Sequence, residues 1–390
     1  MRAQKLGLLS RMIRHLTLDH TREKQFAGIT RTEVRTTKPA WYQIVSKYAK
    51  SNLRKAVWQL FNTLGLYVLL VALMIGIVQR GCSYWITLAI AVLAGGILVR
   101  VFILFHDCCH GSFFASRRAN TILGYVTGIL TFTPFDDWRY AHNRHHATSG
   151  DLDRRGVGDI WTMTTEEYLT ASRLTRIGYR IYRHPIILFG PGAALLFLLF
   201  QRFSKKGASQ AARRSVLITN LALLLVVAVA SQTIGFQTYL RVQLPIILIG
   251  GGLGLWLFYI QHQFEDVYWV RRENWDAMSV ALYGSSYFKL PKILQWFTGN
   301  IGLHHIHHVR PAIPNYNLQQ CYNEVPALEA APTITLKTSI RSLRLGLYDE
   351  KNQKLVSFRS LSARAANPAN GGALLNAALQ TGRFDERLNG

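Results

Sequence analysis

Residues 84–110 read YWITLAIAVLAGGILVRVFILFHDCCH, an apolar run that leads directly into a pair of histidines. Its apolar part, Tyr84–Phe105, is long enough to cross a bilayer core of about 30 Å as a helix. Arg100 is the one charge in that part, and near the end of a span we expect its long side chain to reach the lipid headgroups. The stretch therefore predicts a membrane helix that delivers histidines to one membrane surface.

Three further apolar runs have a similar length and composition. Short segments join the runs in pairs, residues 79–83 in the first pair and the residues around Gly235 in the second. Helices of this length joined by so few residues form tight hairpins. The sequence predicts two transmembrane hairpins, with spans at about Leu60–Val78, Tyr84–Phe105, Val216–Gln232 and Leu244–Ile260.

Two shorter apolar runs, Ile122–Phe135 and Ile186–Phe200, are less suited to crossing a bilayer, and the second contains Gly190-Pro191-Gly192. We expect both to lie at the membrane interface or to pack on a cytoplasmic domain. A β-hairpin is expected within Leu347–Phe358. The predicted fold class is all-α integral membrane, with four transmembrane helices in two hairpins capped by a cytoplasmic helical domain. The predicted organisation is a basic segment at 1–56, a main domain at 57–358 and a disordered tail at 359–390.

The chain has 45 Lys and Arg against 21 Asp and Glu, a net charge of +24. No nucleic-acid recognition module accompanies this charge, so we do not expect nucleic acid as a partner. In a membrane protein, basic residues mark cytoplasmic segments. They flank residues 106–215 and fill the N-terminal segment, whereas the hairpin loops carry almost none. Together with the lack of an apolar signal-peptide core in residues 1–55, this predicts a multi-pass bacterial inner-membrane protein with cytoplasmic termini and a cytoplasmic functional site.

Nine of the thirteen histidines fall in three clusters. His106 and His110 form HxxxH, a second cluster forms HxxHH, and a third forms HHxHH. Spacings of three and four place side chains on one face of a helix, where imidazoles converge on a metal. Surface or core histidines would not gather in this way on one predicted side of a bilayer. Because the clusters hold more donors than one four-coordinate zinc uses, they indicate two metal ions.

The four cysteines are too few and too irregular for a disulfide framework or a paired CxxC zinc site. Cys108 and Cys109 lie between His106 and His110, off the predicted ligand face, and we expect them to be small packing residues. A zinc metalloprotease is excluded because the sequence contains no HExxH motif.

Three segments resemble the three histidine boxes of membrane fatty acid desaturases: FHDCCHGSFF at 105–114, WRYAHNRHHATSGDLD at 138–153 and GNIGLHHIHH at 299–308. IPNYNL at 313–318 is similar to the acyl-lipid omega-6, or delta-12, branch. The resemblance covers roughly residues 40–358. It implies a centre of two iron ions, O₂ as oxidant and an external electron donor.

By this resemblance, the iron ligands would be His106, His110, His142, His145, His146, His304, His307 and His308, with His262 as an extra ligand between boxes two and three. His305 should point to a different face from His304. His15, His20 and His184 are isolated and are expected at the surface.

Carboxylates beside the boxes are candidates to accept hydrogen bonds from ligating imidazoles, because such imidazoles usually donate their second N–H. By proximity these are Asp107, Asp151, Asp153, Asp159, Glu265 and Asp266, and Asn300 is placed similarly or caps a helix. Aromatic and proline residues that line an acyl tunnel, or equally serve in the core, are Phe132, Pro134, Trp138, Trp161 and Trp296.

The implied activity is desaturation: a cis double bond is introduced into an acyl chain carried by a membrane lipid, acyl-CoA or acyl-ACP. The donor would be a separate ferredoxin or cytochrome b5-type protein. The sequence contains no fused cytochrome b5 motif, because His184-Pro185 is followed by Ile-Ile and not by Gly-Gly.

Two alternatives remain at this point. A hydroxylase, epoxygenase or carotenoid ketolase uses the same scaffold and overlapping motifs. A non-enzymatic metal transporter would place ionisable groups inside its spans. Here the runs are nearly free of polar or ionisable residues apart from Asn220 and Arg100, which favours an enzyme.

Overall fold

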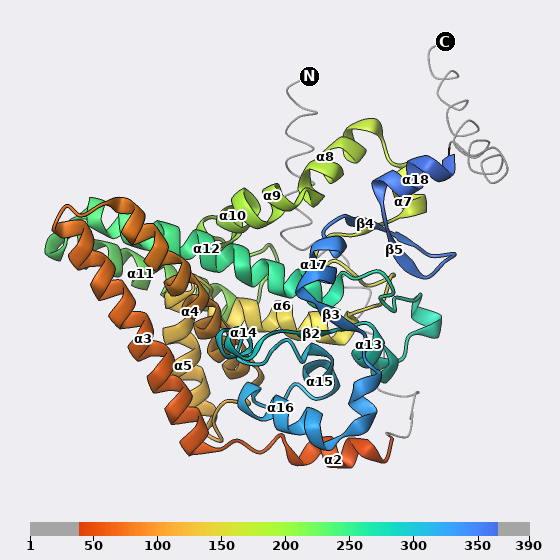
Figure 1. The fold of residues 1–390 in the computed structure, drawn as a ribbon, viewed down its shortest axis with the longest axis horizontal. Coiled ribbons are helices and arrows are strands. Elements are labelled where there is room, and N and C mark those ends of the chain that lie inside the picture. The colour runs from red at the N-terminus through yellow and green to blue at the C-terminus, as the bar shows by residue number, and fades with distance from the viewer. Residues whose placement is uncertain (1–38, 366–390) are drawn as a thin grey trace, which may run out of the picture.

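The computed structural model describes residues 39–365, so the predicted basic segment at 1–56 and the tail at 359–390 lie largely outside the described residues. The fold is mostly helical, as predicted. In Figure 1, the long helices gather at the left of the view, and the strands and short C-terminal helices lie at the right. The four long helices are α3 (Leu53–Gln79), α4 (Tyr84–His110), α11 (Gln210–Thr233) and α12 (Phe236–His262).

The four predicted spans fall inside these four helices, but a fifth segment of the described chain, Pro185–Arg202, is also long and apolar enough to cross a membrane. It comprises α9 (Pro185–Ile187), a π turn at Leu188–Gly192, α10 (Ala193–Leu198) and a 3-10 turn at Phe200–Arg202. The sequence analysis treated this region as broken by Gly190-Pro191-Gly192. The wider π turn accommodates Pro191, which lacks a backbone donor, without ending the helix.

The part outside the long helices is built from short helices and two small sheets. Its helices are α2 (Trp41–Lys47), α5 (Arg117–Leu130), α6 (Phe135–Thr148), α7 (Thr165–Thr170), α8 (Arg173–Arg183), α13 (Ala277–Tyr283), α14 (Lys292–Phe297), α15 (His304–Val309), α16 (Asn315–Glu324), α17 (Leu336–Ser342) and α18 (Phe358–Ala365).

The sheets depart from the all-α prediction. The first joins β1 (Met163–Thr164), β4 (Leu345–Asp349) and β5 (Lys354–Ser357), and the second pairs β2 (Tyr287–Lys289) with β3 (Thr333–Thr335) in parallel. The antiparallel pair β4–β5 confirms the hairpin predicted within Leu347–Phe358. The parallel partners β1 and β3 could not be predicted locally, because each strand is only two or three residues long and its partner is distant in sequence.

Close packing of α4 against α12 positions the site. A side chain added at Gly250 would lie 3.1 Å from the carbonyl oxygen of Gly95, so the two helices approach closely at these glycines. The last turn of α4 and the last residue of α12 therefore reach the same region. Helix α4 ends at His110, and the next residue, Gly111, has a left-handed φ of 67° that lets its N–H bond back to carbonyls of the last turn.

Arg100 does not reach the lipid headgroups as expected. It is buried at 6% exposure, and its Nε donates to Thr63 Oγ1 at 3.0 Å. A second guanidinium N–H donates to the carbonyl oxygen of Trp296, whose ring lies 4.3 Å below the guanidinium carbon. Arg100 thus ties α3, α4 and α14 together inside the protein.

Candidate metal centre

The three histidine clusters and His262 lie at the ends of four helices that meet in space. His106 and His110 occupy the last turns of α4, and the second cluster occupies the last two turns of α6. His262 is the last residue of α12, and the third cluster begins the short helix α15. Cys108 and Cys109 pack in a buried apolar cluster with Leu104, Phe105 and Phe135, which confirms their predicted packing role.

The nine predicted ligands form two histidine groups within which all donor atoms lie within 4.8 Å of one another. The first histidine group is His106, His110, His142, His146 and His307, and the second is His145, His262, His304 and His308. Each group therefore draws on at least three helices. His305 belongs to neither group and packs instead near Tyr287 and Tyr322.

Contacts between imidazole nitrogens have the spacing of metal ligands. In the first group, His146 Nε2 lies 3.1 Å from His142 Nε2 and 2.9 Å from His307 Nε2. In the second, His262 Nε2 lies 3.1 Å from His145 Nε2 and 3.0 Å from His304 Nε2. Two nitrogens bound at right angles to one metal by bonds of about 2.1 Å are about 3 Å apart.

The histidines also have the protonation state that metals require. Burial lowers the pKa of His142 and His146 well below its ordinary value, and neighbouring histidines add to the effect. The pKa values of His304, His307 and His308 are lowered for the same reasons. Neutral imidazoles whose lone pairs converge repel one another until a cation lies between them. In addition, His106 Nε2 and His110 Nε2 are buried without a hydrogen-bond partner among the described residues. The donor sets therefore fit metal ions, and imidazole suits iron.

Three acceptors hold the outer nitrogens of ligand candidates. His106 Nδ1 is 3.2 Å from Asp107 Oδ1, and His145 Nδ1 is 2.5 Å from Asp159 Oδ1. His262 Nδ1 is 3.2 Å from the carbonyl oxygen of Gly284. Because these oxygens can only accept, each Nδ1 carries the proton and each Nε2 lone pair faces its group. Asp107 and Asp159 thus lie where the sequence analysis placed them, whereas the Gly284 carbonyl carries no sequence signal.

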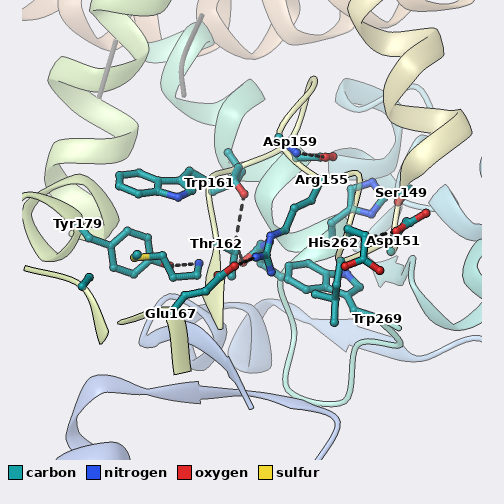
Figure 2. A pocket seen from close by; sticks show the side chains of 18 of the residues that line it. Ser149, Asp151, Arg155, Asp159, Trp161, Thr162, Glu167, Tyr179, His262 and Trp269 are labelled. Carbon is teal, nitrogen blue, oxygen red and sulfur yellow. Dashed lines mark hydrogen bonds and ion pairs between the residues drawn. The ribbon is translucent and has the colours of Figure 1, made fainter. Parts of the chain in front are cut away.

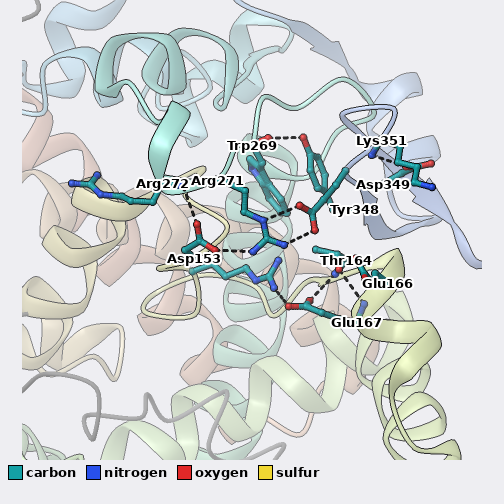
Figure 3. Close-up of polar contacts among 12 residues, drawn as sticks. Asp153, Thr164, Glu166, Glu167, Trp269, Arg271, Arg272, Tyr348, Asp349 and Lys351 are labelled. Atoms are coloured by element: carbon teal, nitrogen blue, oxygen red, sulfur yellow. Dashed lines mark hydrogen bonds and ion pairs between the residues drawn. The ribbon is translucent and has the colours of Figure 1, made fainter. Parts of the chain in front are cut away.

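Three of the other proposed carboxylates bind cations instead of histidines. Asp153 accepts a hydrogen bond of 2.7 Å from Arg271 (Figure 3), and the same guanidinium group also donates to Glu350. Glu265 is exposed and lies 3.8 Å from Lys354. Asp151 pairs with Arg154 at 2.6 Å.

Asn300 and Asp266 form no hydrogen bond or ion pair with an imidazole in the described part of the chain. Asn300 adopts a left-handed φ of 60° in the turn before α15, and its N–H bonds back to Gln295. Its role in the structure is to form this turn. Asp266 lies in the exposed loop after α12. Proximity in sequence was the only reason to propose either residue.

The sequence analysis missed a buried chain of amides behind Asp107. The backbone N–H and the Nδ2 of Asn315 donate to Asp107 Oδ2 at 2.7 and 2.8 Å. Gln59 Nε2, from α3, donates to Asn315 Oδ1 at 2.7 Å. The IPNYNL motif contains Asn315 and was the one available signal, but the motif does not reveal its partners.

Asn315→Ala is expected to weaken iron binding about 10–100-fold, the usual cost of losing a group that orients a ligand. The reason is that Asp107 would lose a hydrogen bond that fixes its carboxylate against His106. Iron content of the purified protein, measured during titration with a chelator, tests this.

Asn317→Ala is the matched control, because Asn317 donates to the carbonyls of Tyr48 and Lys50 and makes no contact with Asp107. It should lower thermal stability while keeping wild-type iron affinity. Equal iron loss in both variants would show that Asn315 merely holds the fold together.

The proposed tunnel residues lie in different places. Trp138 stacks on His142 with 4.3 Å between ring centroids, so it covers the first histidine group. Phe132 and Trp296 pack with the apolar cluster between the long helices, and Pro134 precedes α6. Trp161 lines a separate pocket of about 640 Å³.

This pocket borders the second histidine group. Figure 2 shows His262 and Asp159 on its wall, with Trp161, Tyr179 and Trp269 nearby. The pocket lies between the loop at 149–163, α8 and the end of α12. It joins an aromatic wall to charged residues such as Arg155 and Glu167.

Long apolar helices combined with two histidine groups suited to iron are the features of a membrane protein with a candidate metal centre. The family model for fatty acid desaturases matches residues 83–336, and the chain belongs to that family of oxidoreductases. It is 47% identical over 321 residues to a fatty acid desaturase of Bacillus subtilis, covering 81% of this chain and 90% of that protein.

More distant relatives have names that specify a substrate and a position. An sn-1 oleoyl-lipid 12-desaturase of Picosynechococcus is 25% identical, covering 62% of this chain and 70% of that protein. A protein of the same name in Anabaena variabilis is 23% identical, covering 65% of this chain and 74% of that protein.

Proposed function

We propose that this protein is an O₂-dependent di-iron desaturase that introduces a cis double bond into the acyl chain of a membrane lipid. The observation that carries the proposal is the pair of histidine groups, each with at least four converging donors. Two metal ions with almost only imidazole ligands would account for nine buried or half-buried histidines that gather where α4, α6, α12 and α15 meet.

When bound, the irons would supply the oxidising power to remove two hydrogens from an unactivated carbon pair of the acyl chain. O₂ would be reduced to water by two electrons from the C–H bonds and two from the external donor. The residues of this chain set the conditions. Asp107, Asp159 and the Gly284 carbonyl would keep the protons on the outer nitrogens of their histidines. Trp138, stacked on His142, would exclude water from one side of the first group.

For the substrate, we propose an acyl lipid and the delta-12 position. The support is the IPNYNL motif together with the 12-desaturase names of the cyanobacterial relatives. Acyl-CoA and acyl-ACP are the competing carriers. The electron donor would be a separate ferredoxin or cytochrome b5-type protein, steered by basic residues that include Lys205, Lys206, Arg213 and Arg214.

Expression in a bacterium that lacks polyunsaturated lipids, with an oleoyl supply and a ferredoxin–reductase pair, tests this function. Gas chromatography–mass spectrometry of the lipids should show a second double bond, absent with an empty vector. If the lipids instead contained hydroxylated or epoxidised acyl chains, the protein would be a hydroxylase or an epoxygenase and the desaturase proposal would be wrong. A double bond at another carbon would overturn only the delta-12 assignment. Parallel assays with labelled acyl-CoA and acyl-ACP would show whether either thioester, and not the acyl lipid, is the substrate.

The site is proposed to face the cytoplasm, and the native cysteines offer a direct probe. Cys82, in the loop between α3 and α4, is exposed, whereas Cys108, Cys109 and Cys321 are buried. An impermeant maleimide should therefore label Cys82 in intact cells. In a Cys82→Ser background, Glu166→Cys should be labelled only after permeabilisation, since Glu166 is exposed beside the proposed cytoplasmic site. Labelling of both positions from the same side would contradict the topology.

A further inference from the structure

Helix α8, Arg173–Arg183, has an exposed apolar stripe that no part of the described chain covers. Leu174, Ile177 and Ile181 are 45%, 47% and 51% exposed. Their spacing of three and four residues places them on one face of the helix. Water-facing helices of soluble domains do not usually carry a continuous stripe of this kind. The stripe therefore needs an apolar environment outside the chain.

Cationic side chains border this stripe. Arg173 is exposed and Arg176 is half-buried, whereas the guanidinium of Arg180 donates to the Tyr168 hydroxyl at 2.6 Å and lies over the Phe358 ring. The helix contains no acidic residue. No salt bridge within residues 39–365 neutralises any of the three. Arginine stems lie along apolar surface while their guanidinium groups remain in a polar layer. An apolar stripe beside a row of arginines is the arrangement of a helix that lies in a membrane interface.

The apolar surface continues into the next segment of the chain. Helix α8 leads through His184 into Pro185–Arg202, which is long and apolar enough to lie in a membrane. Figure 1 shows α8, α9 and α10 following one another above α12. Ile186 is 73% exposed, directly after the stripe. This continuity favours a bilayer over an acidic protein as the occupant.

We propose that α8 docks on a bilayer surface that contains anionic lipid, with Leu174, Ile177 and Ile181 immersed and with Arg173 and Arg176 among the phosphates. Each arginine near an anionic surface shifts the ratio of docked to undocked helix about fivefold. The docking concerns the lipid surface and does not depend on the reaction that the site catalyses.

Docking on a bilayer would affect the histidine site, because the opposite face of α8 contacts the pocket and the loop beside the second histidine group. Thr175, Gly178 and Tyr179 line the pocket that borders His262. The Tyr182 hydroxyl accepts from Trp161 N–H at 3.2 Å, and the Tyr179 hydroxyl accepts from Met163 N–H at 3.0 Å. These bonds hold the loop that carries Asp159, the acceptor for His145. Two side chains, Tyr182 and Asp159, thus connect a bilayer on one face of α8 with His145 of the second histidine group.

Spin labels on the full-length protein in nanodiscs test the docking. In a Cys82→Ser background, Ile177→Cys and Ile181→Cys receive a nitroxide, with Glu166→Cys as the exposed control. In discs of phosphatidylcholine with phosphatidylglycerol, power saturation should show labels 177 and 181 accessible to O₂ and shielded from a nickel chelate. Label 166 should show the reverse. In discs of phosphatidylcholine alone, labels 177 and 181 should become more accessible to nickel.

Arg173→Gln with Arg176→Gln separates charge from apolar burial. This variant should lose most of the phosphatidylglycerol dependence, with a shift of about 25-fold in the docked ratio for two arginines. Nickel accessibility at 177 equal to that at 166 would overturn the proposal. So would shielding from both reagents, which marks protein packing, or docking that is indifferent to lipid charge. Because label depth is read without turnover, a desaturase assay that fails leaves this result intact.

Discussion

Replacement of His146 or His307 by alanine is expected to reduce turnover by more than about 100-fold and to lower bound iron. Loss of a group that merely orients a ligand costs about 10–100-fold in metal affinity or activity, and loss of the ligand itself should cost more. His146 Nε2 and His307 Nε2 are 2.9 Å apart in the first histidine group. Removing either imidazole leaves the first histidine group with four of its five nitrogen donors.

Iron per protein and product formation should be measured together, with membrane insertion as the control. Neither residue lies in the five long apolar helices, so both variants should remain in the membrane fraction. If either variant kept near wild-type turnover, the proposed di-iron site would be wrong. Loss of turnover with full iron content would instead assign that histidine a role other than ligation.

A similar loss of turnover and of bound iron is expected for His262→Ala, because the His262 imidazole lies between His145 and His304 in the second histidine group. Its Nε2 lies about 3 Å from those of both His145 and His304, and its Nδ1 bonds to Gly284. Without it the second group retains three donors. We expect iron content to fall towards one ion per chain and turnover to disappear. Iron analysis of the purified variant, followed by a product assay, measures both.

His184→Ala is the first control, because His184 is exposed before α9 and belongs to neither histidine group. His305→Ala is the second control and should keep most activity per folded molecule. His305 is fully buried, and burial lowers its pKa to about 4, as expected of a neutral packing residue. Equal tolerance at 262 and 305 would remove His262 from the ligand set.

The sequence predicted the features that depend on local spacing. The four long helices follow from apolar runs, and the convergence of His106 with His110 follows from a spacing of one helical turn. Asp107 and Asp159 were within reach of such reasoning because each lies close in sequence to the histidines it serves. Family membership followed from the three boxes, and the comparisons confirm it.

Features that depend on distant segments were not predictable in this way. Gln59 and Asn315 are 256 positions apart, and nothing in either local sequence indicates that they bond. Asp153 was proposed for proximity, but its nearest cation, Arg271, comes from a loop 118 positions later. The apolar segment Pro185–Arg202 was expected as an interfacial or packed helix at Ile186–Phe200 and was not counted among the candidate spans, for a different reason. A proline between two glycines normally ends a helix, and only the π turn continues it.

The arrangement of the two histidine groups along the chain has a consequence for biosynthesis. Four of the five members of the first group have been synthesised by residue 146, whereas the second group has only His145 until α12 appears. Both groups are completed within one turn of α15, by the adjacent residues His307 and His308. A nascent or truncated chain that stops before that turn has neither group complete. Neither histidine group is therefore complete until all five long apolar helices of the described chain have been made.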